Sequence, residues 1–95
     1  MHYVYVLKSG RDGQWYTGCT NDLHKRLKDH NDGKVASTKE RVPLELIYYE
    51  ASLNEGDAYA REKYLKSGMG KRYLKNRLKR NLSRTACLRD KSLTG

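Results

Sequence analysis

The sequence has few cysteines and no long apolar stretch, and each shortage excludes a class of protein. Cys19 and Cys87 are the two cysteines of the 95 residues and form no C-x-x-C pair, which argues against a disulfide framework or a zinc site. No apolar run approaches the roughly 20 residues that span a bilayer, so no membrane association is expected. The N-terminus lacks the basic segment and cleavage site of a secretory signal, so the cytoplasm is the expected location.

Acidic residues are scarce in the second half of the chain. Residues 1–50 contain eight basic and seven acidic residues, whereas residues 51–95 contain twelve basic and four acidic residues. Most of the formal net charge of +9 therefore lies in the second half. Concentrated positive charge attracts polyanions with strong salt dependence, so nucleic acid is favoured as a partner over a merely solvated basic surface.

Three strands are predicted from β-forming residues and turn signals. Residues 2–7 have apolar side chains on both faces, as expected for a central strand. Residues 14–20 follow the hairpin signal Asp12-Gly13 and form the second strand. Residues 44–49 follow a polar loop and form the third strand.

The hairpin turn determines which side chains share a face of the sheet. If Asp12-Gly13 is a two-residue loop, Leu7 lies opposite Gly18. Four residues of the two strands then lie on one face: Tyr3, Tyr5, Tyr16 and Gly18. A slip of one residue would move every side chain of one strand to the other face.

Three helices are predicted from capping and periodicity. Asn21 is the expected N-cap of the first helix, which ends near His30. The second helix begins between Ser52 and Asp57, either at the capping-box sequence Ser52-Leu53-Asn54-Glu55 or nearer Gly56, and ends near Ser67-Gly68-Met69-Gly70. The third helix is predicted over residues 71–82.

The element order predicts a compact α+β domain over residues 1–82. A three-stranded β-sheet is flanked by about three α-helices in the order β-β-α-β-α-α. Residues 83–95 are polar and unpatterned and are predicted to form a flexible tail.

Glu62 is the candidate metal ligand. Ala58, Glu62 and Leu65 are spaced as one helical stripe, which places a carboxylate among apolar residues. A buried, unpaired charge is costly, so this glutamate needs a metal, a cation or a hydrogen-bonded partner, unless it reaches water at the edge of the stripe. Because Mg²⁺ is often held by one or two carboxylates with substrate phosphates and water, one glutamate is sufficient.

Polar residues elsewhere suggest phosphate chemistry. Tyr5 and Tyr16 share a face with Gly18, which would let a phosphate or base approach the backbone, although packing is the simpler explanation for each tyrosine. Arg26 and His30 are four residues apart on the first helix. A guanidinium can compensate growing negative charge, and a histidine can move protons near neutral pH.

Two tripeptides carry a resemblance to a known family. Tyr3-Val4-Tyr5, followed after ten residues by Tyr16-Thr17-Gly18, resembles the signature of the GIY-YIG nuclease family. Arg26 resembles the family's arginine on the first helix, and His30 matches a position that holds histidine or tyrosine in members. Glu62 resembles the family's metal-binding glutamate. The similarity covers about residues 2–80, most of the chain, and is closest to the small single-domain branch.

Two positions depart from the family pattern. The first tripeptide begins with Tyr3 where the signature has glycine, which leaves its tyrosine in place. Cys19 follows the second tripeptide, where several nuclease members have a lysine. One phosphate contact of the family is therefore absent from that position.

The resemblance implies an endonuclease that hydrolyses DNA with one Mg²⁺ or Mn²⁺ ion. It implies selectivity for DNA structure, such as branched or single-stranded DNA, rather than sequence, and a role in repair or recombination. The implied catalytic residues are Tyr5, Tyr16, Arg26, His30 and Glu62, with Glu62 as the metal ligand. The predicted substrate-binding residues are Gly18, Lys71, Arg72, Lys75 and Asn76.

Two other functions are compatible with the sequence. A DNA- or RNA-binding module on the same fold would retain the basic charge with weak or no catalysis, and the presence of Arg26 and Glu62 favours the enzyme over it. A protein-interaction domain with incidental positive charge would not bind nucleic acid at physiological salt.

Overall fold

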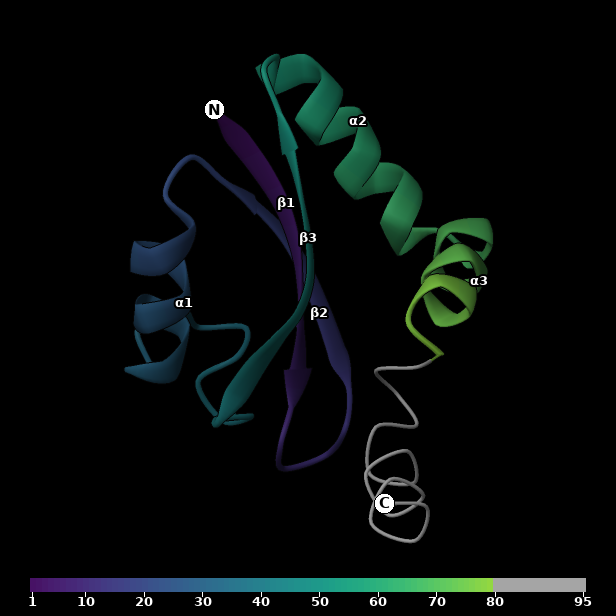
Figure 1. Ribbon diagram of the computed structural model, residues 1–95. Coiled ribbons are helices and arrows are strands. Elements are labelled where there is room, and N and C mark those ends of the chain that lie inside the picture. The colour runs from purple at the N-terminus through teal and green to yellow at the C-terminus, as the bar shows by residue number, and fades with distance from the viewer. Residues whose placement is uncertain (80–95) are drawn as a thin grey trace, which may run out of the picture.

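The computed structural model describes residues 1–79, in which six elements follow one another along the chain (Figure 1). They are β1 (His2–Ser9), β2 (Trp15–Thr20), α1 (Leu23–Asn31), β3 (Leu44–Ser52), α2 (Glu55–Lys66) and α3 (Gly68–Arg77). This order confirms the predicted β-β-α-β-α-α architecture of the α+β class. The predicted tail over residues 83–95 lies outside the described residues. In the described part of the chain, no helix has the length and apolar character to cross a membrane.

The sheet forms the middle layer, and β1 is its central strand. The strand order is β2-β1-β3 with both pairings antiparallel. Val4 and Val6 of β1 face one side, and Tyr5 and Leu7 face the other, each at most 1% exposed. This burial on both faces confirms the predicted central strand. The edge strand β2 therefore has one neighbour in the sheet.

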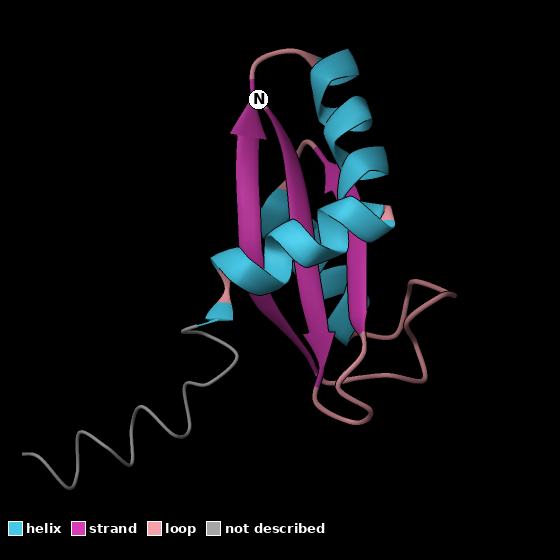
Figure 2. Cartoon of the chain, turned by 90° about the vertical axis from the view of Figure 1, so that its right-hand side faces the viewer, coloured by secondary structure: helices cyan, strands magenta, loops and turns pink. Residues whose placement is uncertain are grey.

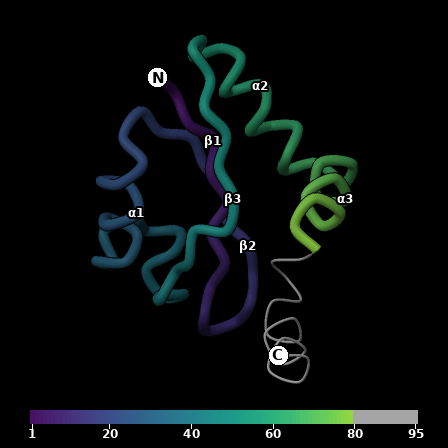
Figure 3. The backbone as a smooth tube through the Cα atoms, in the orientation of Figure 1, coloured from purple at the N-terminus to yellow at the C-terminus, as the bar shows by residue number. Residues whose placement is uncertain are grey.

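Helices cover both faces of the sheet. Helix α1 packs on the side of Tyr5 and Leu7, and α2 and α3 pack on the side of Val4 and Val6 (Figure 3). Figure 2 looks onto the second side, where α3 crosses in front of the strands. Side chains of β2 consequently alternate between the α1 layer and the layer of α2 and α3.

The hairpin register differs from the prediction by two residues. Tyr5 pairs with Gly18, so the prediction that Leu7 lies opposite Gly18 was wrong. The strands close at Ser9 and Gln14, where the Ser9 N–H donates to the Gln14 carbonyl oxygen at 2.9 Å. The turn is therefore longer than the predicted two-residue loop. Because the shift is an even number, the face that each side chain occupies is unchanged.

Helix α1 begins slightly later than predicted, because Asp22, not Asn21, is its N-cap. Helix α2 begins at Glu55 after the N-cap Asn54, within the predicted range of Ser52 to Asp57. Each N-cap side chain accepts a hydrogen bond from the backbone N–H three residues later. At α1 the N–H of Asp22 also donates to the Thr20 hydroxyl at 3.1 Å, which places Asp22 rather than its neighbour at the cap.

Helix α3 begins at Gly68, three residues before the predicted start. The Ser67 side chain ends α2 and caps α3, because its hydroxyl oxygen accepts from the Gly70 N–H at 3.2 Å. The predicted end of the second helix near Ser67-Gly68-Met69-Gly70 is confirmed, because α2 ends at Lys66, but Gly68 and Gly70 lie inside α3. A Cβ on Gly70 would lie 1.9 Å from the Tyr64 carbonyl oxygen, so this glycine permits the close approach of the two helices.

Two glycine-to-alanine substitutions in α3 are expected to differ in their effect on the stability of the domain. Gly70→Ala should destabilise the domain by about 1–3 kcal/mol, because the added methyl group overlaps the backbone of α2. Gly68→Ala is the matched control, since nothing lies within 4 Å of its added Cβ, and it should be neutral or stabilising by up to about 1 kcal/mol. Thermal unfolding of the two variants measures the difference. Equal stabilities would contradict the packing role of Gly70.

Candidate active site

A buried hydrogen-bonded chain lies between β1 and α1. The Tyr5 hydroxyl is 2.9 Å from Nε2 of His30, and Nε of Arg26 donates to the same hydroxyl at 3.3 Å. On the other side of the ring, His30 Nδ1 is 2.7 Å from Oγ1 of Thr38. Tyr5, His30 and Thr38 are at most 1% exposed. The structure therefore brings together three residues that the sequence predicted for the site and one, Thr38, that it did not.

One assignment of protons gives every group in this chain a donor or an acceptor. The Tyr5 hydroxyl accepts from Arg26, and we assign its own hydrogen to the bond with His30 Nε2. His30 then carries its proton on Nδ1 and donates to Thr38. Burial, and next the positive charge of Arg26, lower the pKa of His30 and favour this neutral form. Burial also raises the pKa of the Tyr5 hydroxyl, which stays protonated.

The buried His30 predicts a pH dependence of stability. Its folded-state pKa lies below the ordinary value of 6.5, so the unfolded chain binds the proton more readily. The stabilisation is complete above about pH 6.5 and is lost as the pH falls through the folded-state pKa. Thermal unfolding between pH 7.5 and about pH 5, above the range where carboxylates titrate, should show this loss in the wild type.

Two histidine variants isolate that effect. His30→Gln should remove this part of the pH dependence, whereas His24→Gln, which changes an exposed histidine of the same helix, should keep the wild-type slope. A His30→Gln protein with the wild-type slope would show that another group titrates.

Tyr16 lies at the partly exposed side of this cluster. Its ring centroid lies 5.0 Å from that of His30 and 6.3 Å from that of Tyr5, and its side chain is partly exposed. The hydrogen bond to Tyr5, with a smaller contribution from Tyr16, raises the pKa of Arg26. Arg26 therefore faces both phenols as a permanent cation. A ligand that reached Arg26 and Tyr16 would not need to enter the core.

Gly18 makes room for Tyr5. A Cβ on Gly18 would lie 2.5 Å from the Tyr5 hydroxyl oxygen and 3.1 Å from Cε1 of Tyr16. The sequence suggested that this glycine leaves space for a phosphate or base, but the Tyr5 ring occupies that space. Because Gly18 has no side chain, the ring of Tyr5 on β1 can extend over Gly18, its partner on the edge strand β2.

Glu62 comes from the opposite layer, on α2. Its side chain is 17% exposed, and its Oε2 lies 2.8 Å from Nζ of Lys66, one helical turn later. Burial is the main cause of the raised pKa of Cys19, and the negative charge of Glu62 is the next cause. The same charge makes a smaller contribution to the raised pKa of Tyr5. Glu62 is therefore near the β2 edge. The partly buried glutamate predicted from the sequence is present, and its partner in the structure is a cation.

The donor set is consistent with one Mg²⁺ or Mn²⁺ ion shared with a substrate. Within residues 1–79 no three His, Cys, Asp or Glu side chains form a group that could hold a metal by themselves. A single hard carboxylate oxygen beside a phosphate and water matches how Mg²⁺ is commonly held. Oε2 of Glu62 already binds a positive group, the ammonium of Lys66.

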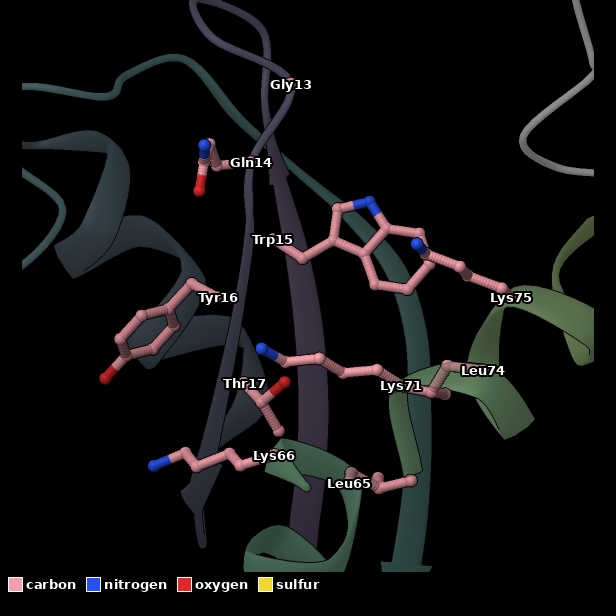
Figure 4. Close-up of a pocket in the computed structure, with 10 residues that line it drawn as sticks. All are labelled: Gly13, Gln14, Trp15, Tyr16, Thr17, Leu65, Lys66, Lys71, Leu74 and Lys75. Atoms are coloured by element: carbon pink, nitrogen blue, oxygen red, sulfur yellow. The ribbon is translucent and has the colours of Figure 1, made fainter. Parts of the chain in front are cut away.

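A basic groove of about 490 Å³ lies between β2 and the helices α2 and α3 (Figure 4). Of the predicted substrate-binding residues on α3, Lys71 and Lys75 line this groove. Arg72 and Asn76 are exposed on the same helix but do not line it. The groove also contains Lys66, which the sequence analysis did not single out.

Comparison with known proteins identifies the family. The model of the GIY-YIG catalytic domain matches residues 1–81, which is most of the chain. The chain belongs to the GIY-YIG family. This family is of the nuclease type and acts on DNA. Its two signature tripeptides lie here in neighbouring strands, with Tyr5 directly opposite Gly18.

Proteins similar to this chain include several UPF0213 proteins. UPF0213 protein YazA of Bacillus subtilis is 52% identical over 66 residues, which are 68% of this chain and 66% of YazA. UPF0213 protein CPE1444 of Clostridium perfringens is 48% identical over 67 residues, 70% of this chain and 71% of that protein. The solution NMR structure of UPF0213 protein BH0048 from Bacillus halodurans is 38% identical, with a TM-score of 0.49 over 77% of this chain and 80% of that one. The chain spans just under two thirds of the length of YazA.

Two residues of this GIY-YIG site were missed from the sequence. Lys66 had a usable signal, because a lysine four residues after a glutamate on a helix is positioned to pair with it. Thr38 had none, because it lies in a polar loop and contacts His30 only through the tertiary fold.

Proposed function

We propose that this protein is a metal-dependent DNA endonuclease that hydrolyses phosphodiester bonds. The observation that carries the proposal is that two groups lie on opposite sides of the sheet near the edge strand β2, close enough for the Glu62 charge to act on Tyr5. The phenols of Tyr5 and Tyr16 with Arg26 and His30 are on one side, and the carboxylate of Glu62 is on the other. Membership of a nuclease-type family supports the same reaction.

Glu62 is the residue that would hold the Mg²⁺ or Mn²⁺ ion. When bound, the ion supplies Lewis acidity and neutralises charge on a phosphate oxygen. Lys66 balances the charge of Glu62 in the free protein and lies at the groove, where it can move its ammonium to a substrate phosphate.

The chain's own residues divide into those that touch the substrate and those that position them. Tyr16 is partly exposed and helps to orient and activate the attacking water. Arg26 donates to the phosphoryl oxygens as their negative charge grows. Tyr5 and His30 are buried, so they act as positioning residues that hold Arg26 and the Tyr16 ring in place.

DNA contacts away from the cut are assigned to α3. Lys71, Arg72, Lys75 and Asn76 are exposed on one helix and would contact the DNA backbone, whereas Gly18, predicted to bind substrate, would act indirectly by leaving room for the Tyr5 ring. Backbone contacts give affinity without sequence information, so the selectivity is for DNA structure. We therefore propose that the protein cleaves DNA in the cytoplasm during DNA repair or recombination.

The chemical test is the analysis of product ends. Attack by water with departure of the 3′ oxygen leaves a 5′-phosphate and a 3′-hydroxyl. Labelled DNA incubated with the protein and Mn²⁺ should give only these ends. Ends that carry a 3′-phosphate would contradict the mechanism. Binding without any cut would favour the alternative, a nucleic-acid-binding module on this fold.

A further inference from the structure

Neighbouring residues of β2 present aromatic rings to opposite layers. Tyr16 faces α1 and the buried chain of Tyr5, whereas Trp15 faces α3 and lines the basic groove. Figure 4 shows the Trp15 indole pointing toward α3 and the Tyr16 ring pointing the other way. The two rings are separated only by the thickness of an edge strand, so one ligand that wraps this edge can reach both.

The groove around Trp15 is lined by three lysines, of which Lys66 pairs with Glu62, a carboxylate outside the lining. Lys66 enters it from α2, and Lys71 and Lys75, one helical turn apart, enter it from α3 (Figure 4). None of its ten lining residues is acidic. Its apolar floor consists of Leu65, Leu74 and the indole. An aromatic surface surrounded by lysines is the combination by which proteins hold single-stranded nucleic acid.

We propose that this groove binds an unpaired nucleotide of the DNA substrate, with its base against Trp15 and its phosphates on the lysines. A volume of about 490 Å³ is that of a small-ligand site, and the indole is recessed between a strand and a helix. A base with a free face can enter such a site, whereas a base pair stacked inside a duplex cannot. The charge complements a phosphate backbone.

The proposal defines a substrate class and rests on the proposed nuclease function. The strand that occupies the groove passes around β2 and presents its next phosphate near Tyr16 and Arg26. The preferred DNA therefore has an unpaired segment beside the cut, as in a flap, a frayed end or a bubble. Blunt duplex DNA would make only the backbone contacts of α3.

The fluorescence of Trp15 reports on the groove directly, because the chain contains one tryptophan. The full chain would be titrated in chelator, so that no cleavage occurs, with a short oligothymidylate, an abasic phosphodiester strand of equal length and a blunt duplex. Fluorescence anisotropy of a labelled strand reports binding, and indole emission reports stacking. The oligothymidylate should quench emission and bind roughly tenfold or more tightly than the abasic strand. The abasic strand and the duplex should bind without quenching.

Unchanged emission at saturating oligothymidylate would overturn the proposal. The variant Trp15→Leu keeps an apolar side chain against the core and removes the aromatic surface. Its affinity for oligothymidylate should fall to that of the abasic strand, about tenfold. Tyr59→Leu, which removes an exposed aromatic ring of α2 outside the groove, is the matched control and should bind as the wild type does. Circular dichroism checks that both variants fold.

Failure of this proposal and failure of the nuclease function are distinguishable. A folded Trp15→Leu protein that binds oligothymidylate with wild-type affinity would reject nucleotide binding in the groove, even if the wild type cuts DNA. Quenching by oligothymidylate in a protein that never cuts DNA supports the groove and rejects the nuclease.

Discussion

Replacing Glu62 by glutamine is expected to lower metal-dependent cleavage by at least about 100- to 1,000-fold, the range found when a group that stabilises transition-state charge is removed. Glutamine has nearly the same shape and keeps the packing of α2, but it has no charge with which to hold a divalent cation. Glu62 pairs with Lys66 in the free protein, so the variant also removes the charge that holds that lysine. The loss should appear in the rate at saturating metal and in the binding of Mn²⁺.

The matched control for this variant is Glu55→Gln. Glu55 is an exposed glutamate in the first turn of the same helix, so its replacement removes the same charge without touching the site. Its cleavage rate should stay close to that of the wild type. A folded Glu62→Gln protein that cuts DNA at the wild-type rate would remove the carboxylate from the mechanism.

Replacing Arg26 by glutamine is expected to lower the cleavage rate by about 100- to 1,000-fold, because a cation aimed at the growing phosphoryl charge is lost. The variant also breaks the donation from Nε to the Tyr5 hydroxyl, although Tyr5 keeps its bond to His30. Arg26→Lys should give an intermediate rate, since lysine restores the charge but lacks the planar fork of donors.

The control for Arg26 is the residue before it. Lys25 is exposed and paired with Asp29 on the surface of α1, so Lys25→Gln changes the net charge by the same amount. Its effect should be small and should disappear in higher salt. Equal losses in the two variants would mean that Arg26 acts only through the overall charge of the protein.

The shared face of the tyrosines could be predicted from the sequence, because side chains alternate along a strand and only a register error of an odd number of residues would change the face. The predicted turn was too short, yet Tyr5, Tyr16 and Gly18 still lie on one face, since a shift of two residues preserves the alternation. The spacing of Ala58, Glu62 and Leu65 likewise identified a partly buried glutamate, because a helix repeats every 3.6 residues.

Features that depend on contacts across the fold could not be predicted. That Gly18 accommodates the Tyr5 ring requires knowing how the two strands pair. The bond between Thr38 and His30 joins a loop to a helix, and no local pattern encodes it. Gly70 lies inside α3, where the absence of a side chain allows the backbone to approach Tyr64 of α2. A glycine in a sequence does not by itself indicate such a contact.

The most direct test of the proposed function is cleavage by the wild-type protein in the presence and absence of a divalent metal. Labelled duplex, single-stranded, flap and branched DNA would each be incubated with Mg²⁺, with Mn²⁺ and with chelator. We expect cleavage with either metal, none in chelator, and a preference for the substrates that carry an unpaired segment. A folded protein that binds these DNAs and cuts none of them with either metal would contradict the assignment as a nuclease.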